Sequence, residues 1–184
     1  MPWAGGLADV WHAADQERRS AGEAAPPRVD GLTETTEPAP PRDAATRRRD
    51  TEERLATDVD LWVATTDGDT PYLVPLSFDW DGETVLLSTS ERSVTGRNLV
   101  RTVTVRLALG PTRDVVLVDG TVEVMPMDAL PTGQADRFAS RTGFDPRVEQ
   151  GFVWFQVRPR RIQAWREANE LAGRELMRDG QWLV

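Results

Sequence analysis

Three short apolar runs separated by Asp-Gly dipeptides constrain the fold of this chain more than any other feature. The runs cover residues 61–65, 72–78 and 84–89, with Asp67-Gly68 and Asp81-Gly82 between them. Short runs rich in β-branched and aromatic residues predict strands, and Asp-Gly is a favoured hairpin turn. Because Asp67, Asp69, Asp79 and Asp81 flank the turn glycines, turn formation explains them better than metal binding. The sequence predicts an antiparallel array of strands.

Later segments continue the same pattern. Residues 103–109 alternate apolar and polar residues, and residues 114–124 form a long run in which Gly120 predicts a bend or bulge. Residues 152–157 and 161–165 predict two late strands divided by Pro159, and Pro75 predicts an edge or bulge position in the second strand. A short helix is expected at 93–101, and a loop and helix at 128–141. Short strands with one helix inserted after the third favour a closed or split β-barrel.

The first 50 residues differ in composition from the rest. Apolar residues at helical spacing predict a possible short helix near residues 5–19, and the segment from 20 to 50 predicts a flexible extension because it has few large apolar residues. Arg47, Arg48 and Arg49 are interpreted as a solvated charge cluster. A brief helix is expected at 51–56, packing Leu55. The predicted organisation is a barrel domain at 51–168 and a C-terminal tail at 169–184 that packs on the barrel or a partner.

Composition excludes several kinds of chemistry. The chain has 184 residues, a net charge of −8, no cysteine, no lysine and one histidine, His12. The acidic charge argues against nucleic-acid and membrane partners. Without cysteine or lysine there is no thiol nucleophile, zinc-thiolate site or Schiff base, and one histidine cannot build a multi-histidine metal site. No apolar stretch is long enough to predict a membrane span, and no basic segment followed by an apolar one predicts a signal peptide. A cytoplasmic location is expected. An enzyme of this composition would rely on a cofactor.

One segment has the composition of an anion site. Hydroxyls at Ser88, Thr89 and Ser90 precede Ser93, Thr95, Gly96, Arg97 and Asn98 at the expected start of a helix. Amide, hydroxyl and guanidinium donors at a helix N-terminus favour a phosphate, and Gly96 would let the backbone approach it. Arg97 is the main cation, with Arg92 as a second. Alternatives stay open: Ser93 as a helix cap, Arg97 paired with Glu91, and Asn98 capping the turn.

The ordered stretch WVATTDGDTPYLVPLSFDWDGETVLLSTSERSVTGRNLVR resembles the pyridoxamine 5′-phosphate oxidase-like family of flavin- or deazaflavin-binding split barrels. The resemblance extends over residues 51–165. It implies a mainly β fold with a six-stranded Greek-key split barrel of the FMN-binding type. It also implies a homodimer with cofactor sites at the interface, and FMN or coenzyme F-420 as the cofactor.

The same resemblance implies where the cofactor lies. Its phosphate would sit against residues 93–98, although many relatives have basic residues where this chain has Ser93 and Thr95. The ring would lie along the second and third strands, and the residues expected beside it are Val74, Pro75, Leu76, Ser77, Ser88, Thr89 and Ser90. Trp165, from its own chain or from the partner subunit, would face the cofactor or substrate.

Three functions are compared at this stage. The first is an oxidoreductase that transfers hydride between FMN or coenzyme F-420 and a small organic substrate. The second is a non-catalytic split barrel that binds a flavin-type ligand or haem. The third, an oligonucleotide-binding barrel, is disfavoured by the net charge of −8 and by the lack of an aromatic–basic stripe.

Overall fold

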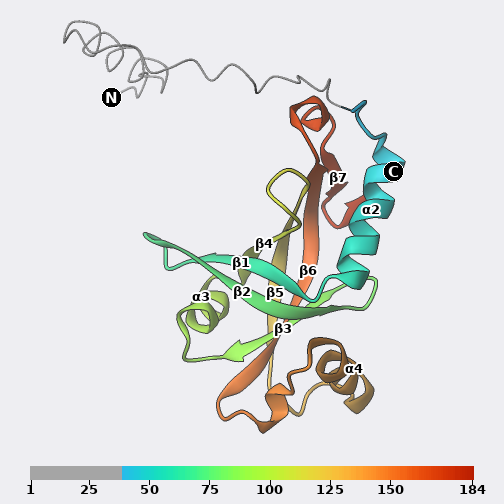
Figure 1. Ribbon diagram of the computed structural model, residues 1–184. Coiled ribbons are helices and arrows are strands. Elements are labelled where there is room, and N and C mark those ends of the chain that lie inside the picture. Colours follow the sequence, from blue (N-terminus) through green and yellow to red (C-terminus); the bar gives the residue numbers. More distant parts are fainter. Residues whose placement is uncertain (1–38) are drawn as a thin grey trace, which may run out of the picture. The chain divides into compact units, whose positions relative to one another are not determined.

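A closed antiparallel β-barrel forms the centre of the computed structural model, which describes residues 39–184 (Figure 1). Six strands form it in the order β3-β2-β1-β4-β5-β6, and pairing of β3 with β6 closes the ring. Their bounds are β1 Asp60–Thr66, β2 Pro71–Trp80, β3 Val85–Ser90, β4 Thr104–Leu109, β5 Val115–Met125 and β6 Phe152–Trp165. The predicted mainly β, six-stranded barrel is confirmed. The predicted helix near 5–19 and His12 lie outside the described residues.

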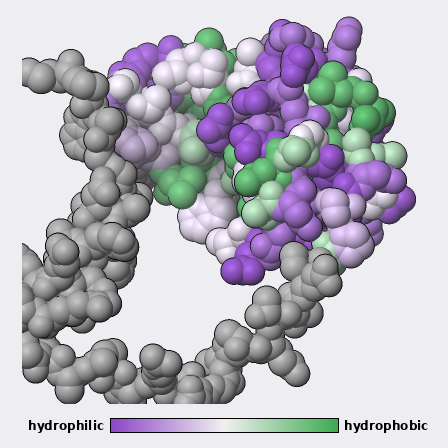
Figure 2. All heavy atoms as spheres, turned by 90° about the horizontal axis from the view of Figure 1, so that it is seen from above, coloured by the Kyte–Doolittle hydropathy of each residue, from purple (hydrophilic) through white to green (hydrophobic). Residues whose placement is uncertain are grey.

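Helices and two short strands surround the barrel. The helices are α2 Ala44–Thr57, α3 Val94–Thr102 and α4 Thr132–Thr142, with 3₁₀ turns η1 Pro146–Val148 and η2 Ala168–Glu170. Strands β7 Glu175–Arg178 and β8 Gln181–Trp182 extend the sheet beyond the C-terminal half of β6. In the described part of the chain, none of the helices is long and apolar enough to cross a membrane. On the face seen in Figure 2, hydrophobic residues lie in separate groups between hydrophilic ones.

The barrel opens between β2 and β3. These strands pair only where residues 78–80 meet residues 85–87. Beyond that point residues 74–77 pair with β1 alone, and residues 88–90 pair with β6 alone. Pro75 lies on this open edge of β2, where its missing N–H is not needed by β3, so the predicted edge position is confirmed. Helix α3 follows β3 and lies beside the opening (Figure 1).

Strand alternation separates the barrel interior from its outer surface. Leu61, Val63, Leu107 and Val118 point inward and are fully or almost fully buried. Helix α4 covers part of the outer surface, where Phe138 packs edge-on against Trp154 with ring centroids 5.0 Å apart. Apolar side chains therefore lie on both sides of the sheet under α4, and on the inner side elsewhere.

Helix α2 begins seven residues earlier than expected. Asp43 caps it by accepting a hydrogen bond from the Thr46 amide at 2.7 Å. Arg47 is buried and donates to the Glu170 carbonyl at 3.3 Å, so the prediction of a solvated cluster is wrong for this residue. The predicted flexible extension therefore does not reach residue 50. Sequence composition missed this because the partner of Arg47 lies more than 120 residues away.

Pro159 does not divide the last barrel strand, contrary to the sequence prediction. Strand β6 runs unbroken through it, and the register with β5 shifts there: Asp119 pairs with Arg161, and Gly120 pairs with Pro159. Arg160 has no opposite residue on β5, so the strand pair contains a β-bulge at this point. A proline is tolerated at a bulge because the ladder is already disrupted there. The predicted bulge at Gly120 is confirmed.

Asp79 is not a turn residue, which corrects the sequence interpretation. Its side chain is buried on the outer face of β2, where Arg137 Nη2 lies 2.7 Å and Arg141 Nη1 3.8 Å from its carboxylate oxygens. It thus holds α4 on the barrel. Asp67 and Asp81 do form turns, since Asp67 Oδ1 accepts from Asp69 and Thr70 amides, and Asp81 Oδ1 from the Thr84 amide at 2.6 Å.

Candidate functional site

Ser93 caps helix α3, as one of the alternatives from the sequence proposed. Its Oγ accepts a hydrogen bond from the Gly96 amide at 2.9 Å, and its carbonyl accepts from the Arg97 amide at 3.0 Å. The hydroxyl of Thr89 lies 3.4 Å from the same Oγ. Because the cap already uses the Gly96 amide, the Val94 and Thr95 amides are the groups of the first turn that could meet an anion.

Gly96 has a packing role rather than the predicted role of admitting an anion. A Cβ atom built there would lie 2.2 Å from the Ser90 carbonyl oxygen and 2.9 Å from the Glu91 carbonyl oxygen. The absent side chain therefore lets α3 pack on the turn that precedes it. The interpretation of Gly96 as an opening toward a ligand is wrong.

Thr95 and Asn98 lie on the buried side of α3. The Asn98 side-chain amide donates to Thr65 Oγ1 at 3.2 Å, which ties α3 to the end of β1. Leu99, on the same side, is fully buried in the barrel core. These residues fix the position of the helix, and Asn98 also borders the cavity described next.

The exposed side of α3 borders a cavity of about 820 Å³, here called the α3 pocket. Three arginines supply the positive charge of its lining: Arg92, Arg97 and Arg101. Arg97 donates to the Arg92 carbonyl, and Arg101 Nη2 donates to the Thr66 carbonyl at 3.1 Å. The remaining lining residues are Asp67, Glu91, Val94, Asn98 and Val100.

None of these three guanidinium groups forms an ion pair with a carboxylate of residues 39–184. The predicted alternative pair of Arg97 with Glu91 is not formed. Backbone amides of Thr70 and Asp69, together with the charge of Arg101, lower the pKa of Asp67, so this carboxylate is ionised at the pocket edge. A cluster of unpaired guanidinium groups is a site for phosphate or carboxylate.

Arg101 was missing from the residues expected at the site. It stands four positions after Arg97, which places both on one side of a helix. That spacing was the available signal. The sequence could not show that Arg101 would meet a carbonyl of β1 rather than an acidic side chain.

The residues expected beside a ring divide between two surfaces. Val74 and Leu76 pack against the barrel core, and Thr89, two positions after the buried Leu87, is on the same side of its strand. Pro75 is exposed on the outer surface, as its pairing opposite the exposed Trp62 requires. The others on the outer side are Ser77, bonded to Asp60 at 2.6 Å, Ser88, bonded to the Val153 carbonyl at 3.0 Å, and Ser90.

Trp165 does not line the α3 pocket of its own chain. It ends β6, opposite Val115, whereas α3 adjoins the end of the barrel where β3 finishes. Arg174 stacks on its ring at 5.5 Å. A shared site with α3 would require Trp165 of a second chain.

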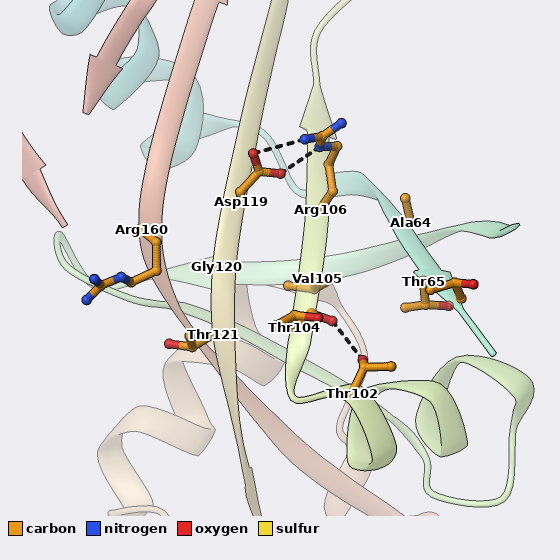
Figure 3. Close-up of a pocket in the computed structure, with 11 residues that line it drawn as sticks. Ala64, Thr65, Thr102, Thr104, Val105, Arg106, Asp119, Gly120, Thr121 and Arg160 are labelled. Atoms are coloured by element: carbon orange, nitrogen blue, oxygen red, sulfur yellow. Dashed lines mark hydrogen bonds and ion pairs between the residues drawn. The ribbon is translucent and has the colours of Figure 1, made fainter. Parts of the chain in front are cut away.

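A second cavity of about 520 Å³ lies beyond the end of α3 (Figure 3). Threonines dominate its lining, with Thr104 and Thr121 directly opposite each other on β4 and β5. Arg106 and Asp119 face one another across the same strands in a two-pronged ion pair of 2.6 and 3.0 Å. The hydrogen bond from Arg101 to Thr66, which lines this cavity, connects its rim with the α3 pocket.

A sequence profile of the pyridoxamine 5′-phosphate oxidase family matches residues 51–166. The chain belongs to this family. The matched region contains all six barrel strands and α3. The resemblance found in the sequence is confirmed.

Solved structures of related proteins share the fold. An F420 reductase is 21% identical with a TM-score of 0.52, over 60% of this chain and 94% of the reductase. A FAD-binding protein from Mesorhizobium loti is 19% identical with a TM-score of 0.53, over 62% and 89% of the two chains. The haem storage protein HutZ from Vibrio cholerae is 15% identical with a TM-score of 0.55, over 67% and 99%. No curated protein matches the chain in sequence.

Proposed function

We propose that this protein is an oxidoreductase that binds FMN or coenzyme F-420 and transfers hydride between that cofactor and a small organic substrate. One observation carries the proposal. Three arginines that pair with no carboxylate of residues 39–184 border the α3 pocket, beside the opening between β2 and β3 of a pyridoxamine 5′-phosphate oxidase-family barrel. Relatives of this fold include an F420 reductase and a FAD-binding protein.

The α3 pocket fits the anionic part of such a cofactor. Arg92, Arg97 and Arg101 supply permanently charged donors, and the amides of Val94 and Thr95 lie at the positive end of a helix. In this proposal, Arg97 and Arg101 on the outer side of the helix supply the positive charge that the resemblance places at the positions of Ser93 and Thr95. Ser93 and Thr95 keep the helix in place instead.

The ring would lie on the outer surface beside the opening, against Pro75, Ser77, Ser88 and Ser90. Of the residues expected there, Val74, Leu76 and Thr89 would support this wall from inside the barrel. When bound, the cofactor supplies hydride transfer, a chemistry that needs no histidine, cysteine or lysine from the chain. The chain binds and orients the cofactor and excludes water from one side of the ring.

A homodimer would complete the site as part of this proposal. Trp62 and Leu73 stand on the outer face of β1 and β2, and Leu73 is 57% exposed. Large exposed apolar side chains on one sheet face favour a protein interface. Trp165 of the second chain could then approach the α3 pocket of the first. We further propose a cytoplasmic location, because a cysteine-free composition suits a reducing compartment.

Binding without catalysis is the second candidate, and the haem version of it is disfavoured by composition. Haem iron is held by histidine, cysteine, methionine or tyrosine, and the chain has no cysteine, one histidine, His12, one tyrosine, Tyr72, and four methionines, which leaves few candidate axial ligands. A flavin-type storage or sensing role would use the same α3 pocket. Mixing protein loaded with reduced cofactor with quinone and nitro acceptors under anaerobic conditions separates the roles. Turnover supports the oxidoreductase, and binding without turnover of any acceptor supports storage.

The proposal is tested by titrating the purified full-length protein with FMN and with coenzyme F-420, followed by absorbance and fluorescence. Saturable binding of either in the micromolar range is expected. A lack of binding of both at millimolar concentration would remove the proposed function. The ratio of the two dissociation constants decides which cofactor the protein uses.

A further inference from the structure

We propose that a cavity between the β2–β3 turn and the β7–β8 turn binds a small aromatic carboxylate, that is, a planar ring with one anionic group. The cavity, here called the hairpin pocket, has a volume of about 510 Å³, which is in the range of pockets that hold small ligands. It adjoins the start of β3, whereas α3 follows the end of this strand. It shares no lining residue with the α3 pocket, so the inference goes beyond the proposed function and does not depend on it.

The hairpin pocket lies where one edge of β6 has no neighbouring strand. Strand β5 pairs with the other edge along most of β6, so β3 and β7 share this edge. Pairing with β3 ends at Val157, and pairing with β7 begins at Ile162. The bulge that follows Pro159 falls in this gap. Because proline has no N–H, this part of β6 can border a cavity with one donor fewer to satisfy.

Tight turns hold the two sides of the gap in place. On one side, Asp81 Oδ1 accepts a hydrogen bond from the Glu83 amide at 2.9 Å. On the other side, Asp179 and Gly180 have φ angles of 52° and 78°, as in a type I′ hairpin turn. The Gly180 amide donates to the Arg160 carbonyl at 2.9 Å, which attaches this turn to β6. The shape of the hairpin pocket is therefore fixed by hydrogen bonds to the backbone.

Apolar side chains line the hairpin pocket on the side of the barrel core. They are Trp80, Met177 and Trp182, and all three pack with the core residues. Both indole rings belong to partly exposed residues. Arg48 of α2 lies 4.6 Å from the centroid of the Trp182 ring and does not line the pocket, so it supports this ring from outside. Two indole rings beside one cavity favour an aromatic ligand, because ring pairs are stabilised beyond the area that they bury.

Two arginines of β6 supply the groups that would bind an anion. Arg158 Nη1 lies 3.0 Å from Glu83 Oε1, and Arg160 Nη2 lies 3.7 Å from Asp179 Oδ1. The acids are 79% and 83% exposed, whereas the arginines are 57% and 51% exposed. Exposed ion pairs contribute little stability, so a ligand carboxylate can take the place of either acid. Because the guanidinium groups are the less exposed members, the geometry favours an anionic ligand over a cationic one.

Arg160 also lines the second cavity, which affects the choice of a variant. Figure 3 shows its side chain directed away from Arg106 and Asp119, and its guanidinium pairs with the β7–β8 turn instead. Arg158 does not line the second cavity. Arg158 is therefore the arginine whose substitution tests the hairpin pocket without changing the second cavity.

The experiment is calorimetric titration of the full-length protein with indole-3-acetate, indole and tryptamine, which share a ring and differ in charge. Indole-3-acetate should bind about tenfold more tightly than indole because it adds a charge-assisted contact, and tryptamine should bind no more tightly than indole. Arg158→Gln should remove the advantage of indole-3-acetate and leave indole binding unchanged. Trp182→Leu should weaken both about tenfold. Arg113→Gln is the matched control, because Arg113 is exposed and pairs with Glu167 outside the pocket.

Equal affinity for indole-3-acetate and indole would overturn the inference, as would an unchanged advantage of indole-3-acetate in Arg158→Gln. Tighter binding of tryptamine than of indole-3-acetate would overturn it in favour of a cationic ligand. If Trp182→Leu does not fold, Arg158→Gln decides, because Arg158 is exposed. Saturating FMN or coenzyme F-420 should leave the affinity for indole-3-acetate unchanged, and competition would assign the probe to the cofactor site and overturn the inference. Failure of both cofactors to bind would remove the proposed function alone.

Discussion

Arginines serve opposite purposes in two regions of this barrel. Beside α2, a set of residues here called the Glu170 network consists of Arg42, Arg54, Arg166, Asp50, Asp114 and Glu170, and each of its arginines meets a carboxylate within 3.2 Å. In the α3 pocket, Arg92, Arg97 and Arg101 meet no carboxylate of the described residues. The network links α2 to later parts of the chain, whereas the proposed function assigns the charge of the pocket to an anionic ligand.

The residues of the Glu170 network are also more buried than the arginines of the α3 pocket. Glu170 is 3% exposed and accepts hydrogen bonds from the Arg42 side chain and from the Arg42 and Arg166 amides. The three pocket arginines are exposed, and Arg97 and Arg101 donate to backbone carbonyls. Exposed, unpaired charges contribute little to stability. Mutations in the network should therefore lower the free energy of unfolding, and mutations in the pocket should lower ligand affinity.

The largest effect is expected for Glu170→Gln. The substitution leaves Arg42 half-buried without its main partner, and breaking such a pair costs about 3–5 kcal/mol of unfolding free energy. Urea unfolding followed by circular dichroism measures the change. A loss below about 1 kcal/mol would show that the network does not stabilise the fold.

The pH dependence of stability tests the network without a mutation. Hydrogen bonds from Arg42 lower the pKa of Glu170 from 4.5 to about 2. Since the folded state has the lower pKa, the carboxylate stabilises the fold above pH 4.5 and this stability is lost as the pH falls toward 2. The lowered pKa of Glu170 corresponds to roughly 3 kcal/mol of unfolding free energy at neutral pH. Urea unfolding at pH 7 and pH 3 should show a smaller decline for Glu170→Gln than for wild type, and parallel declines would contradict the assignment.

Arg97→Ala should weaken cofactor binding and leave stability unchanged, the opposite of Glu170→Gln. Removing a charge-assisted phosphate contact should weaken cofactor binding by about 1.5–3 kcal/mol, and the melting temperature should stay the same because Arg97 is exposed. Cofactor titration of Arg97→Ala measures the change. Arg113→Ala is the control, because Arg113 is 83% exposed and pairs with Glu167. An unchanged dissociation constant would place the phosphate elsewhere.

The smallest effect concerns backbone strain at the end of α3. Val103 adopts a left-handed conformation at φ 49° and is 50% exposed, which is unfavourable for a β-branched residue. Val103→Gly should raise the free energy of unfolding by up to about 1 kcal/mol, since glycine accepts this conformation freely. Thermal unfolding measures it, and a clear drop in stability would show that the valine side chain makes a needed contact.

Local features of the barrel could be predicted from the sequence, and distant partnerships could not. The Asp-Gly turns, the alternation of the strands, the bulge at Gly120 and the edge position of Pro75 depend on neighbouring residues. The course of β6 through Pro159 depends on the register with another strand. The early start of α2 depends on contacts of Arg42 and Arg47 with Glu170, more than 120 residues away.

The candidate site shows the same division. The helix after β3 and its Ser93 cap followed from residue types and spacing, and the phosphate contact of Arg97 stays a prediction. Three features could be found only from the structure. Gly96 lets α3 pack on the preceding turn, Arg101 borders the pocket, and Val74 and Leu76 face the core whereas Pro75 faces outward. Whether an arginine is paired depends on which acid the fold brings to it, and this decides between a structural and a binding role.

The central claim is that the arginines of the α3 pocket, which pair with no carboxylate in the described part of the chain, hold the anionic part of a flavin-type cofactor. Titration calorimetry of FMN and coenzyme F-420 against wild type and an Arg92→Gln/Arg97→Gln/Arg101→Gln triple variant tests it most directly. The account predicts binding to wild type, at least about 100-fold weaker binding to the triple variant, and equal melting temperatures. A triple variant that binds either cofactor as tightly as wild type would contradict it.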